Sequence, residues 1–520
     1  MTKVVIDPIT RIEGHLRITV DVENGVVKDA WNTCTLFRGF EIFMKNRDPR
    51  DAWQFAQRIC GVCPTPHAHN GLLAAERAIG LQTVPDNARL VRNIMEASQL
   101  AYDSILWFYI LNAFDYVNVP NALNAKASTP TLKAVQDQVA AVVASGQLGP
   151  FANMYWDHPG YKLSADLDLE LTAHYLQAIE AQQAANDAAV PIGGKFPMIM
   201  NYAVGGVTML PSLEALIFYK SKMADVAAFT SNVMLNDLLA IAPFYLDLAK
   251  TGKGHANYLT WGVLDGKSQQ PADRIFPAGG IKGGDLKVFD VDPDQVRRFT
   301  KASWYADSLG GGKHPLDGGQ EPIEFTAMPP IDGAAFPSGK YDWTQAARYG
   351  ADNLPMEVGP LAEVLVAYGR GNQEVVGLVD AVLAAVGATG HPEILMSNLG
   401  RIAARVIKAK VNADHAAEWA DLIIANIKAG DTSCYTEHAT PATGRGHGGW
   451  DAPRGALCHY MELEGGKISK FAAVPASNWN LSPRDDAGVR GPVEEALIGM
   501  PVADPARPLE VLRVVHTFDP

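Results

Sequence analysis

The sequence predicts an α+β fold that is mainly α, with a bundle of long helices as its core, β-rich segments at both ends and an irregular insert. Long stretches between residues 49 and 430 show helical hydrophobic periodicity, whereas residues 1–32 include the period-two alternation of a strand. Residues 251–355 are dense in Gly, Pro, Asp and Ser. With 48% hydrophobic and 19% charged residues, the 520-residue chain can bury a large core.

The elements follow one another in a fixed order along the chain. A β-rich segment (1–48) precedes a helical core (49–250), an irregular or small-β insert (251–355), a second helical part (356–430) and a β-rich C-terminal segment (431–520). Leu16–Val22 alternates with period two, and Asn24-Gly25 is typical of the hairpin turn that leads to a return strand. Long helices are predicted over residues 88–113, 168–188, 213–250, 361–388 and 398–430. We expect the two β-rich ends to meet, because each carries chemistry that the other lacks.

Composition excludes several classes of protein. A net charge of −13 with no clustered basic surface argues against nucleic-acid binding and against a polybasic membrane dock. No stretch approaches the about 18 uninterrupted apolar residues of a spanning helix, so no direct membrane span is expected. Five cysteines, an odd and sparse number, argue against a disulfide scaffold. Residues 1–10 lack the pattern of an export signal, so we expect a cytoplasmic chain or one carried across a membrane by a partner.

The strongest local motif runs from Arg58 to His67 and reads RICGVCPTPH. Cys60 and Cys63 can chelate one metal ion or bridge two, because Gly61 lets the backbone fold tightly around them. Half of a zinc site and a thioredoxin-type redox pair are the alternatives. A zinc site needs two more ligands, and no second CxxC follows. A redox pair needs a βαβ unit, whereas this motif lies between helical stretches.

Three ionisable residues stand in unusual contexts. Glu13, between Ile and Gly, is a candidate buried proton carrier, since desolvation favours its neutral form; a surface carboxylate is the alternative. Arg454, between Pro and Gly, is a candidate guanidinium of fixed position, which could bind an anionic ligand or place a base next to a metal. The alternative is a structural ion pair with Asp451. Asp103 lies inside the apolar stretch 88–113 and needs a proton or a cationic partner, for which Arg454 is a candidate.

Taken together, the motifs closely resemble the large subunit of nickel–iron hydrogenases over the length of the chain. They occur in the order DPITRIEGH, FRGFE, RDPRDAW, RICGVCPTPH, VASGQLGPFANMYWDHP, EVGPLA, APRG and HTFDP. The resemblance makes the zinc and thioredoxin interpretations of the CxxC motif very improbable.

The resemblance implies a catalytic subunit that reversibly and heterolytically oxidises dihydrogen to protons and electrons. That family holds a nickel–iron centre with four cysteines. Cys60 matches a terminal nickel ligand and Cys63 a ligand that bridges nickel and iron. The iron carries carbon monoxide and cyanide ligands, in a pocket whose residues Pro453, Arg454 and Ser477 match. Thiolates are soft donors suited to both metals.

The resemblance also implies a proton path and a second ion. Glu13 matches the first proton-transfer carboxylate, which would receive its proton from a ligating chalcogen or from the Arg454 guanidine. Asp103 and Asp519 match acidic residues packed around that arginine. Glu41 matches a ligand of a distal magnesium or iron ion.

Partners follow from the same resemblance. Five cysteines are too few to hold iron–sulfur clusters as well, so the electrons must leave by another route. The family uses a small subunit that carries those clusters, in a heterodimer or a dimer of heterodimers, and maturation proteins are further expected partners. We expect a periplasmic location, or a periplasm-facing membrane association through the small subunit, with the cytoplasm as the alternative.

The sequence departs from the family pattern at two places. Many relatives have histidines where Ser104 and Trp107 stand, in a packing layer near the site. The family also continues after Asp-Pro with a CxxCxxH motif that supplies the other two metal ligands, whereas this sequence ends at Asp519-Pro520. Cys34, Cys434 and Cys458 do not stand in such a motif. Two thiolates alone should not hold an intact nickel–iron centre.

Two alternatives to a catalytic subunit remain open at this point. One is a metal-free scaffold or quinone-site subunit of the same ancestry, like that of respiratory complex I, although that relative has lost the cysteine motif. The other is an inactive, truncated paralogue. Metal analysis of the purified heterodimer separates these interpretations, because nickel and iron near one each would indicate the catalytic subunit.

The end of the sequence generates one prediction. A branch of the family uses selenocysteine, encoded by UGA, at the ligand that follows Asp-Pro, and residues 482–499 and 476–477 resemble that branch. We therefore expect the gene to continue through UGA into a tail that carries CxxH; a chain trimmed at a processed or disordered end is the competing explanation. Sequencing the gene tests this: UGU or UGC after the Pro520 codon would indicate ordinary cysteine, and UAA or UAG a truncated paralogue.

Overall fold

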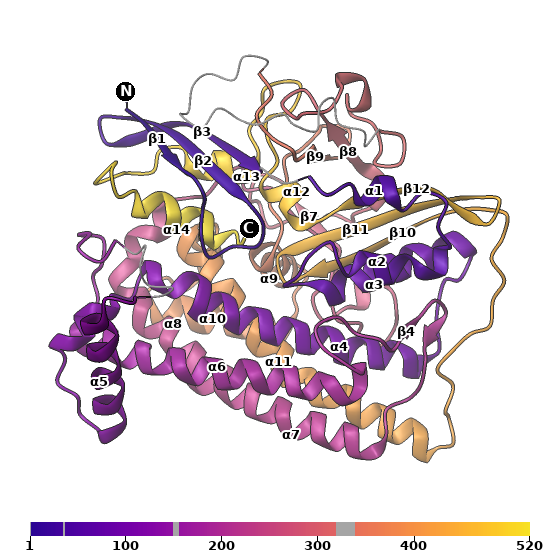
Figure 1. The fold of residues 1–520 in the computed structure, drawn as a ribbon, viewed down its shortest axis with the longest axis horizontal. Helices are drawn as coiled ribbons and strands as arrows, with labels where there is room; N and C mark the ends of the chain where they lie inside the picture. The colour runs from indigo at the N-terminus through magenta and orange to yellow at the C-terminus, as the bar shows by residue number, and fades with distance from the viewer. Residues whose placement is uncertain (1, 35–36, 149–154, 319–338) are drawn as a thin grey trace.

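The structure, a computed structural model, describes residues 2–34, 37–148, 155–318 and 339–520. It has two layers (Figure 1): long helices lie side by side in the lower layer, and two three-stranded sheets with shorter elements cover them. This mainly helical α+β arrangement confirms the predicted fold class. Residues 149–154 of the motif that begins VASGQLG lie outside the described residues.

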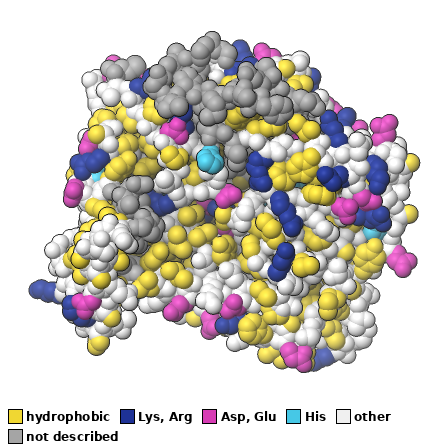
Figure 2. Space-filling model, viewed as in Figure 1, with side chains coloured by type: hydrophobic (Ala, Val, Ile, Leu, Met, Phe, Trp, Pro, Cys, Tyr) yellow, Lys and Arg dark blue, Asp and Glu magenta, His cyan; other side chains and the backbone are white. Residues whose placement is uncertain are grey.

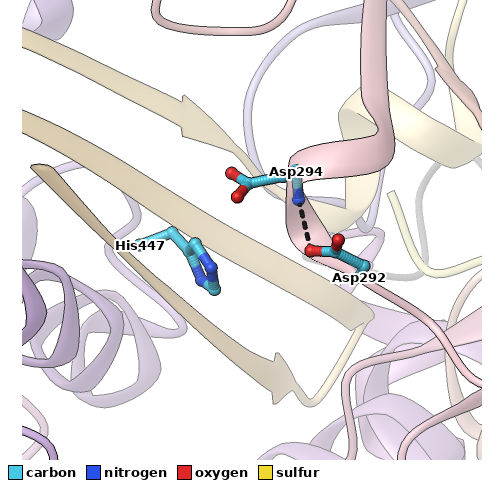
Figure 3. Close-up of side chains that lie close together, drawn as sticks. All are labelled: Asp292, Asp294 and His447. Atoms are coloured by element: carbon cyan, nitrogen blue, oxygen red, sulfur yellow. Dashed lines mark hydrogen bonds between the residues drawn. The ribbon is translucent and has the colours of Figure 1, made fainter.

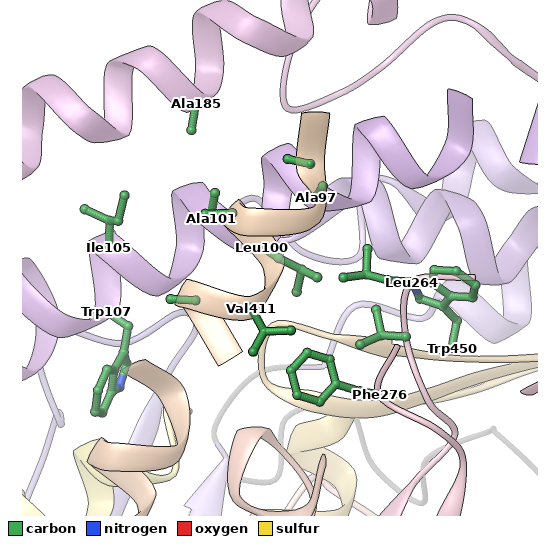
Figure 4. Close-up of a cluster of buried hydrophobic side chains, with 14 of the residues drawn as sticks. Ala97, Leu100, Ala101, Ile105, Trp107, Ala185, Leu264, Phe276, Val411 and Trp450 are labelled. Atoms are coloured by element: carbon green, nitrogen blue, oxygen red, sulfur yellow. The ribbon is translucent and has the colours of Figure 1, made fainter. Parts of the chain in front are cut away.

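Four long helices form the bundle. They are α4 (Asp86–Ile105), α6 (Ala165–Gly193), α7 (Leu213–Phe229) and α11 (Asn398–Lys428). Small side chains at their contacts, among them Ala97, Ala101 and Ala185, are fully buried and let the helix backbones approach closely (Figure 4). Serines cap the longest helices: the side chains of Ser164 and Ser397 accept hydrogen bonds from the first turns of α6 and α11.

The predicted helices agree with the structure to different degrees. The stretches 168–188 and 398–430 correspond to α6 and α11. The stretch 88–113 continues beyond α4 as a π-helical segment over Leu106–Asn112. A single helix over 361–388 is wrong, because α9 (Pro360–Gly369) and α10 (Gln373–Ala385) are separated at Gly371, whose φ of 74° is left-handed.

The predicted helix over 213–250 is one helical run with local changes of winding. After α7 come a π-helical turn (Thr230–Met234), α8 (Leu235–Ile241) and a 3-10 segment (Ala242–Lys250). By length and composition alone this run could cross a membrane, and 44% of its most apolar window is buried inside the structure. It contributes to the core of the helix bundle. Figure 2 shows apolar side chains spread among charged ones over the face in view.

The N-terminal sheet has the order β1-β2-β3 and is antiparallel. Its strands are β1 (Thr2–Ile6), β2 (Leu16–Glu23) and β3 (Val26–Cys34). The predicted hairpin turn is confirmed, since Asn24 and Gly25 both have positive φ, at 53° and 74°. The loop between β1 and β2 contains Glu13.

The C-terminal sheet has the order β10-β11-β12, also antiparallel. Its strands are β10 (Thr443–Ala452), β11 (Gly455–Glu464) and β12 (Lys467–Val474). Strand β10 lies directly on α3 (Pro64–Ile79). Glycines at alternate positions of β10 permit this contact: a Cβ at Gly444 or Gly446 would overlap the backbone of Ala78, and one at Gly448 the carbonyl oxygen of Asn70.

The two ends of the chain meet, as expected. A hydrophobic cluster joins Val20 and Val27 of the N-terminal sheet to Val493 of α13 (Pro492–Leu497) and Val514 of α14 (Leu509–Thr517). In addition, the Glu13 amide donates a hydrogen bond to the Pro520 carbonyl at 3.2 Å. The last residues of the sequence are thereby placed beside the β1–β2 loop.

The remaining elements are short. The helices are α1 (Phe40–Phe43), α2 (Ala52–Ala56), α5 (Pro130–Ser145) and α12 (Ala476–Asn480). Two-stranded pairs are formed by β4 (Tyr202–Ala203) with β5 (Gly206–Val207), β6 (Tyr258–Thr260) with β7 (Gly279–Ile281), and β8 (Val296–Phe299) with β9 (Ala346–Tyr349). The last two pairs lie in the predicted insert, and the C-terminal segment contains three helices besides its strands.

The contact between β10 and α3 generates a stability prediction. Gly448→Ala should destabilise the fold by about 1–3 kcal/mol, because the new methyl group would force the strand away from α3. Gly377→Ala, in an open position of α10, is the matched control and should be neutral or slightly stabilising. The melting temperatures of both variants test this, and an unchanged value for Gly448→Ala would contradict it.

Candidate functional site

Segments that are far apart in the sequence converge on one cavity of about 190 Å³. Its lining includes Glu13, Cys60, Cys63, Arg454, Ser477 and Pro520. A larger cavity of about 320 Å³ lies between α5 and α6, and its described lining contains no Cys, His or carboxylate. The smaller cavity is therefore the candidate site, because it gathers the groups that can do chemistry.

The two cysteines lie in the tight turn that leads into α3. Cys63 is the N-cap residue of α3, and its amide donates a hydrogen bond to the Cys60 sulfur at 3.1 Å. Both thiols are buried and neither forms a disulfide. The hydrogen bond with Cys63 holds the pKa of Cys60 below its ordinary value against the opposing effect of burial, and the charge of Arg454 contributes in the same direction. The turn thus presents one thiol that ionises readily.

Arg454 lies in the turn between β10 and β11 and is 5% exposed. Gly455 at φ 118° lets this turn approach Gly359 so closely that a Cβ would overlap the Gly359 backbone. Among the described residues, the Nε and Nη1 atoms of Arg454 have no hydrogen-bond acceptor. Buried donors of this kind require an acceptor, so the cavity favours an electron-rich ligand beside the guanidinium.

Arg454 forms ion pairs with two carboxylates. Its Nη2 lies 3.0 Å from Asp519 Oδ1, and its Nη1 lies 3.6 Å from Asp103 Oδ1. Burial alone would lower the pKa of the guanidinium, but Asp519 and Asp103 raise it well above its ordinary value. The expected pairing of Asp103 with Arg454 is present in the structure. The alternative pairing with Asp451 is not, because that carboxylate accepts hydrogen bonds from Thr260 and Trp261.

A second arginine, which the sequence did not single out, completes this charge cluster. Arg405 of α11 is buried, and its Nη2 lies 3.5 Å from Asp519 Oδ2. Its guanidinium carbon lies 4.0 Å from the ring centroid of Trp107, whose indole N–H donates to the His516 carbonyl. Trp107, noted as a departure from the family pattern, therefore packs against the cation that shares Asp519 with Arg454. The sequence signal that could have revealed Arg405 is an arginine among apolar residues in the first half of a long predicted helix.

Glu13 lies at the mouth of the cavity, and of the two interpretations of its sequence context the surface carboxylate is the one that the structure supports. It is exposed in the isolated chain, because the β1–β2 loop passes over the rim rather than into the core. Its carboxylate Oε1 accepts a hydrogen bond from the Gly61 amide at 3.3 Å. The side chain thus connects the cysteine turn to the outside of the molecule.

Of the other predicted site residues, some line this cavity and others do not. Ser477, in the first turn of α12, lines the cavity, whereas Pro453 is buried in the β10–β11 turn and does not line it. Glu41 lines a separate cavity of about 210 Å³, where it accepts hydrogen bonds from Arg298 and the Ala473 amide. His67, close to the cysteines in sequence, also lines the first cavity, and burial lowers its pKa to about 3.

Comparison with known proteins gives consistent matches. Residues 38–520 match a family described as Nickel-dependent hydrogenase, and residues 3–32 match one described as HoxL-like. The Hydrogenase-2 large chain of Escherichia coli K12 is 39% identical, with 100% of this chain and 96% of that protein covered. The uptake hydrogenase large subunit of Rhizobium leguminosarum bv. viciae is 36% identical, with 100% and 94% covered.

Solved structures match over the whole chain as well. The Ni-Fe-Se hydrogenase from D. vulgaris Hildenborough is similar at a TM-score of 0.82 and 32% identity, with 100% of this chain and 98% of that chain covered. The [NiFeSe]-hydrogenase of Dm. baculatum gives a TM-score of 0.83 at 30% identity, with the same coverage.

The buried charge cluster generates a prediction on stability. The pKa of Asp103 is raised by burial to about 7, above the value of about 3.9 in an unfolded chain. Between these values the folded protein holds a proton that the unfolded chain has lost. Stability therefore falls as the pH rises through this window, by at most about 1.4 kcal/mol per pH unit.

Asp103→Asn removes this titration. The melting temperature of the variant minus that of the unsubstituted protein should therefore increase as the pH rises from 4 to 7. Above pH 7 this difference in melting temperature should become constant. Asp137→Asn, which removes an exposed carboxylate of α5, is the matched control. A temperature difference for Asp103→Asn that does not change with pH would contradict the prediction.

Proposed function

This chain belongs to the nickel-dependent hydrogenase family and is the large, catalytic subunit of a hydrogenase, and from that membership we propose how its own residues serve the reaction. The observation that carries the proposal is the convergence of two buried thiols and a buried guanidinium with unpaired donors on one cavity. The family indicates a nickel–iron centre. We assign that centre to this cavity.

The residues of the cavity fit two of the four thiolate positions that the family pattern implies for such a group. Thiolates are the soft donors that nickel and low-spin iron prefer, and Cys60 and Cys63 offer two from a single rigid turn. The Nε of Arg454, which has no hydrogen-bond acceptor among the described residues, can donate to the carbon monoxide and cyanide ligands that the family's iron carries, with Ser477 as a further donor. When bound, the nickel–iron centre supplies the redox chemistry that converts dihydrogen into two protons and two electrons.

Residues of this chain stabilise charge in the cavity and transfer protons. Asp519 and Asp103 favour the cationic form of Arg454, so we assign it the role of a hydrogen-bond donor rather than a base. Proton transfer falls to the thiolates and to Glu13, whose Oε1 contacts the cysteine turn through the Gly61 amide. Because Glu13 is exposed at the mouth, it can release the proton away from the cavity.

Glu41 belongs to a second proposed site. Its cavity is separate from the first, although both are lined by Arg38, Ile59 and Pro475. We propose that Glu41 contributes to a distal magnesium or iron ion, as its match to the family motif implies. In the structure its carboxylate already has a guanidinium partner, Arg298, so the ion would share an oxygen with that arginine.

Partners and location follow from the relatives. Related proteins are named as large subunits of uptake hydrogenases and as the large chain of a quinone-reactive Ni/Fe-hydrogenase. We propose a heterodimer with a cluster-bearing small subunit, facing the periplasm or associated with its membrane through that subunit. A metal-free scaffold of the complex I type is not favoured, because both thiols of the motif line the cavity.

Removal of either thiol tests the assignment of the metal site. Cys60→Ala or Cys63→Ala should reduce the nickel content of the purified heterodimer to near zero and abolish activity, because each removes a ligand of a site that binds through thiolates. Cys434→Ser, a half-buried cysteine that does not line the cavity, is the control and should retain nickel. Full nickel in either alanine variant, measured by elemental analysis, would refute the assignment.

The role of Glu13 is tested by replacing its carboxylate with an amide of the same shape. Glu13→Gln should retain nickel and iron but slow dihydrogen/deuterium exchange at least about 100-fold, because the amide cannot carry the proton. Glu23→Gln, an exposed glutamate at the end of β2, is the matched control. Exchange at the unsubstituted rate in Glu13→Gln would show that protons leave by another path.

A further inference from the structure

A cluster of metal-ligating side chains lies away from both cavities, where the insert meets the C-terminal sheet (Figure 3). Asp292 and Asp294 stand at the 3-10 turn Pro293–Gln295 before β8, and His447 stands on β10. One ligand atom from each lies within 4.8 Å of the other two. None of the three lines the cavity of the cysteines or that of Glu41.

The turn holds the backbone positions of the two aspartates. Asp292 caps the turn, since its Oδ1 accepts a hydrogen bond from the Asp294 amide at 2.9 Å. The Pro293 carbonyl between them accepts a hydrogen bond from the Tyr460 hydroxyl of β11. This bond ties the turn to the sheet that carries His447, so the three side chains are held near one another by the backbone.

His447 is available as a ligand. Neither of its ring nitrogens has a hydrogen-bond partner among the described residues, and the ring is half-buried beside Tyr460. An imidazole nitrogen without a hydrogen-bond partner can offer its lone pair to a metal ion.

An independent observation points to the same place. His314, whose side chain is only 10% exposed, directs its Nε2 at Asp294 Oδ1 across 3.4 Å, without a hydrogen bond to any described residue. Its Nδ1 accepts hydrogen bonds from the Leu316 amide and from Arg445, so the ring proton is on Nε2. A buried N–H aimed at a carboxylate is the arrangement that orients a metal-binding carboxylate from outside.

We propose that Asp292, Asp294 and His447 bind a divalent transition-metal ion of the zinc class, with His314 orienting Asp294. One imidazole nitrogen and two carboxylate oxygens suit such an ion, and water completes its coordination. The exposed carboxylates can rotate to shorten their separation to the spacing that bonds of about 2 Å require. The ion links two segments that are far apart in sequence, the insert and the C-terminal sheet, and its role is to hold them together.

The local charge is compatible with a cation. Asp292 and Asp294 contribute two negative charges, and the positive charges of Arg77 and Arg445 also act on His447. Arg445 lies between the carboxylates of Asp317 and Glu462, at 3.9 and 3.8 Å. Arg297 is engaged with the backbone carbonyls of Asp294 and Val296.

Zinc titration of the purified hydrogenase complex, with its nickel site filled, tests the proposal. Isothermal calorimetry should show saturable binding of one zinc ion, weakened at least ten-fold in Asp294→Asn and in His447→Gln. His391→Gln, which removes an exposed histidine beside a carboxylate elsewhere, is the matched control and should bind as the unsubstituted protein does. Melting temperatures measured without zinc establish that the variants are folded.

X-ray absorption at the zinc edge separates this site from the cysteine turn. The expected spectrum shows nitrogen and oxygen neighbours, including one imidazole, without sulfur. Sulfur coordination, equal zinc affinity in all variants, or the absence of saturable binding would each overturn the proposal. Zinc should also raise the melting temperature of the unsubstituted protein but not of Asp294→Asn, as binding to the folded state alone requires.

Discussion

The guanidinium of Arg454 is the constraint around which the site is built. A charge that is 5% exposed cannot persist without compensation, and it is compensated by Asp519 at 3.0 Å and Asp103 at 3.6 Å. These two carboxylates come from the end of the sequence and from the last turn of α4. Asp519 is the nearer partner, and removing it would leave the guanidinium with Asp103 alone, so the ion cluster fixes how three distant segments fit together.

The same cluster explains why the end of the sequence lies where it does. Asp519 is shared between Arg454 and Arg405, and Arg405 is itself packed on the Trp107 ring. Helix α14 is anchored further by His516, whose ring contacts Asp115 at 2.6 Å. Pro520 is thereby held against the Glu13 amide at the rim of the cavity. Ion pairs and hydrogen bonds, together with the apolar cluster that α14 joins, position this segment relative to the cysteine turn.

Sequence reasoning predicted what depends on local pattern. The hairpin at Asn24-Gly25, the long helix over 398–430 and the gathering of Cys60, Cys63 and Arg454 were all predictable, because turn chemistry, periodicity and motif resemblance carry them. The break at Gly371 was missed, since a single glycine within a periodic stretch is compatible with a continuous helix. The exposure of Glu13 was left open between two interpretations, and the role of Arg405 was missed. Both depend on which surfaces face one another in three dimensions, which no local pattern encodes.

The reactive groups stand at ends of elements rather than within them, and this has a chemical consequence. The cysteines precede α3, Arg454 occupies the turn between β10 and β11, and Ser477 lies in the first turn of α12. Each turn is fixed by a tightly packed element on at least one side, and the glycines of β10 bring α3 and the Arg454 turn to within contact of one another. The donors are therefore held in place by the backbone, and little conformational entropy is lost when a metal group enters. Glu13, the proposed proton carrier, stands on the exposed β1–β2 loop at the mouth of the cavity, where its carboxylate contacts both the cysteine turn and the surroundings.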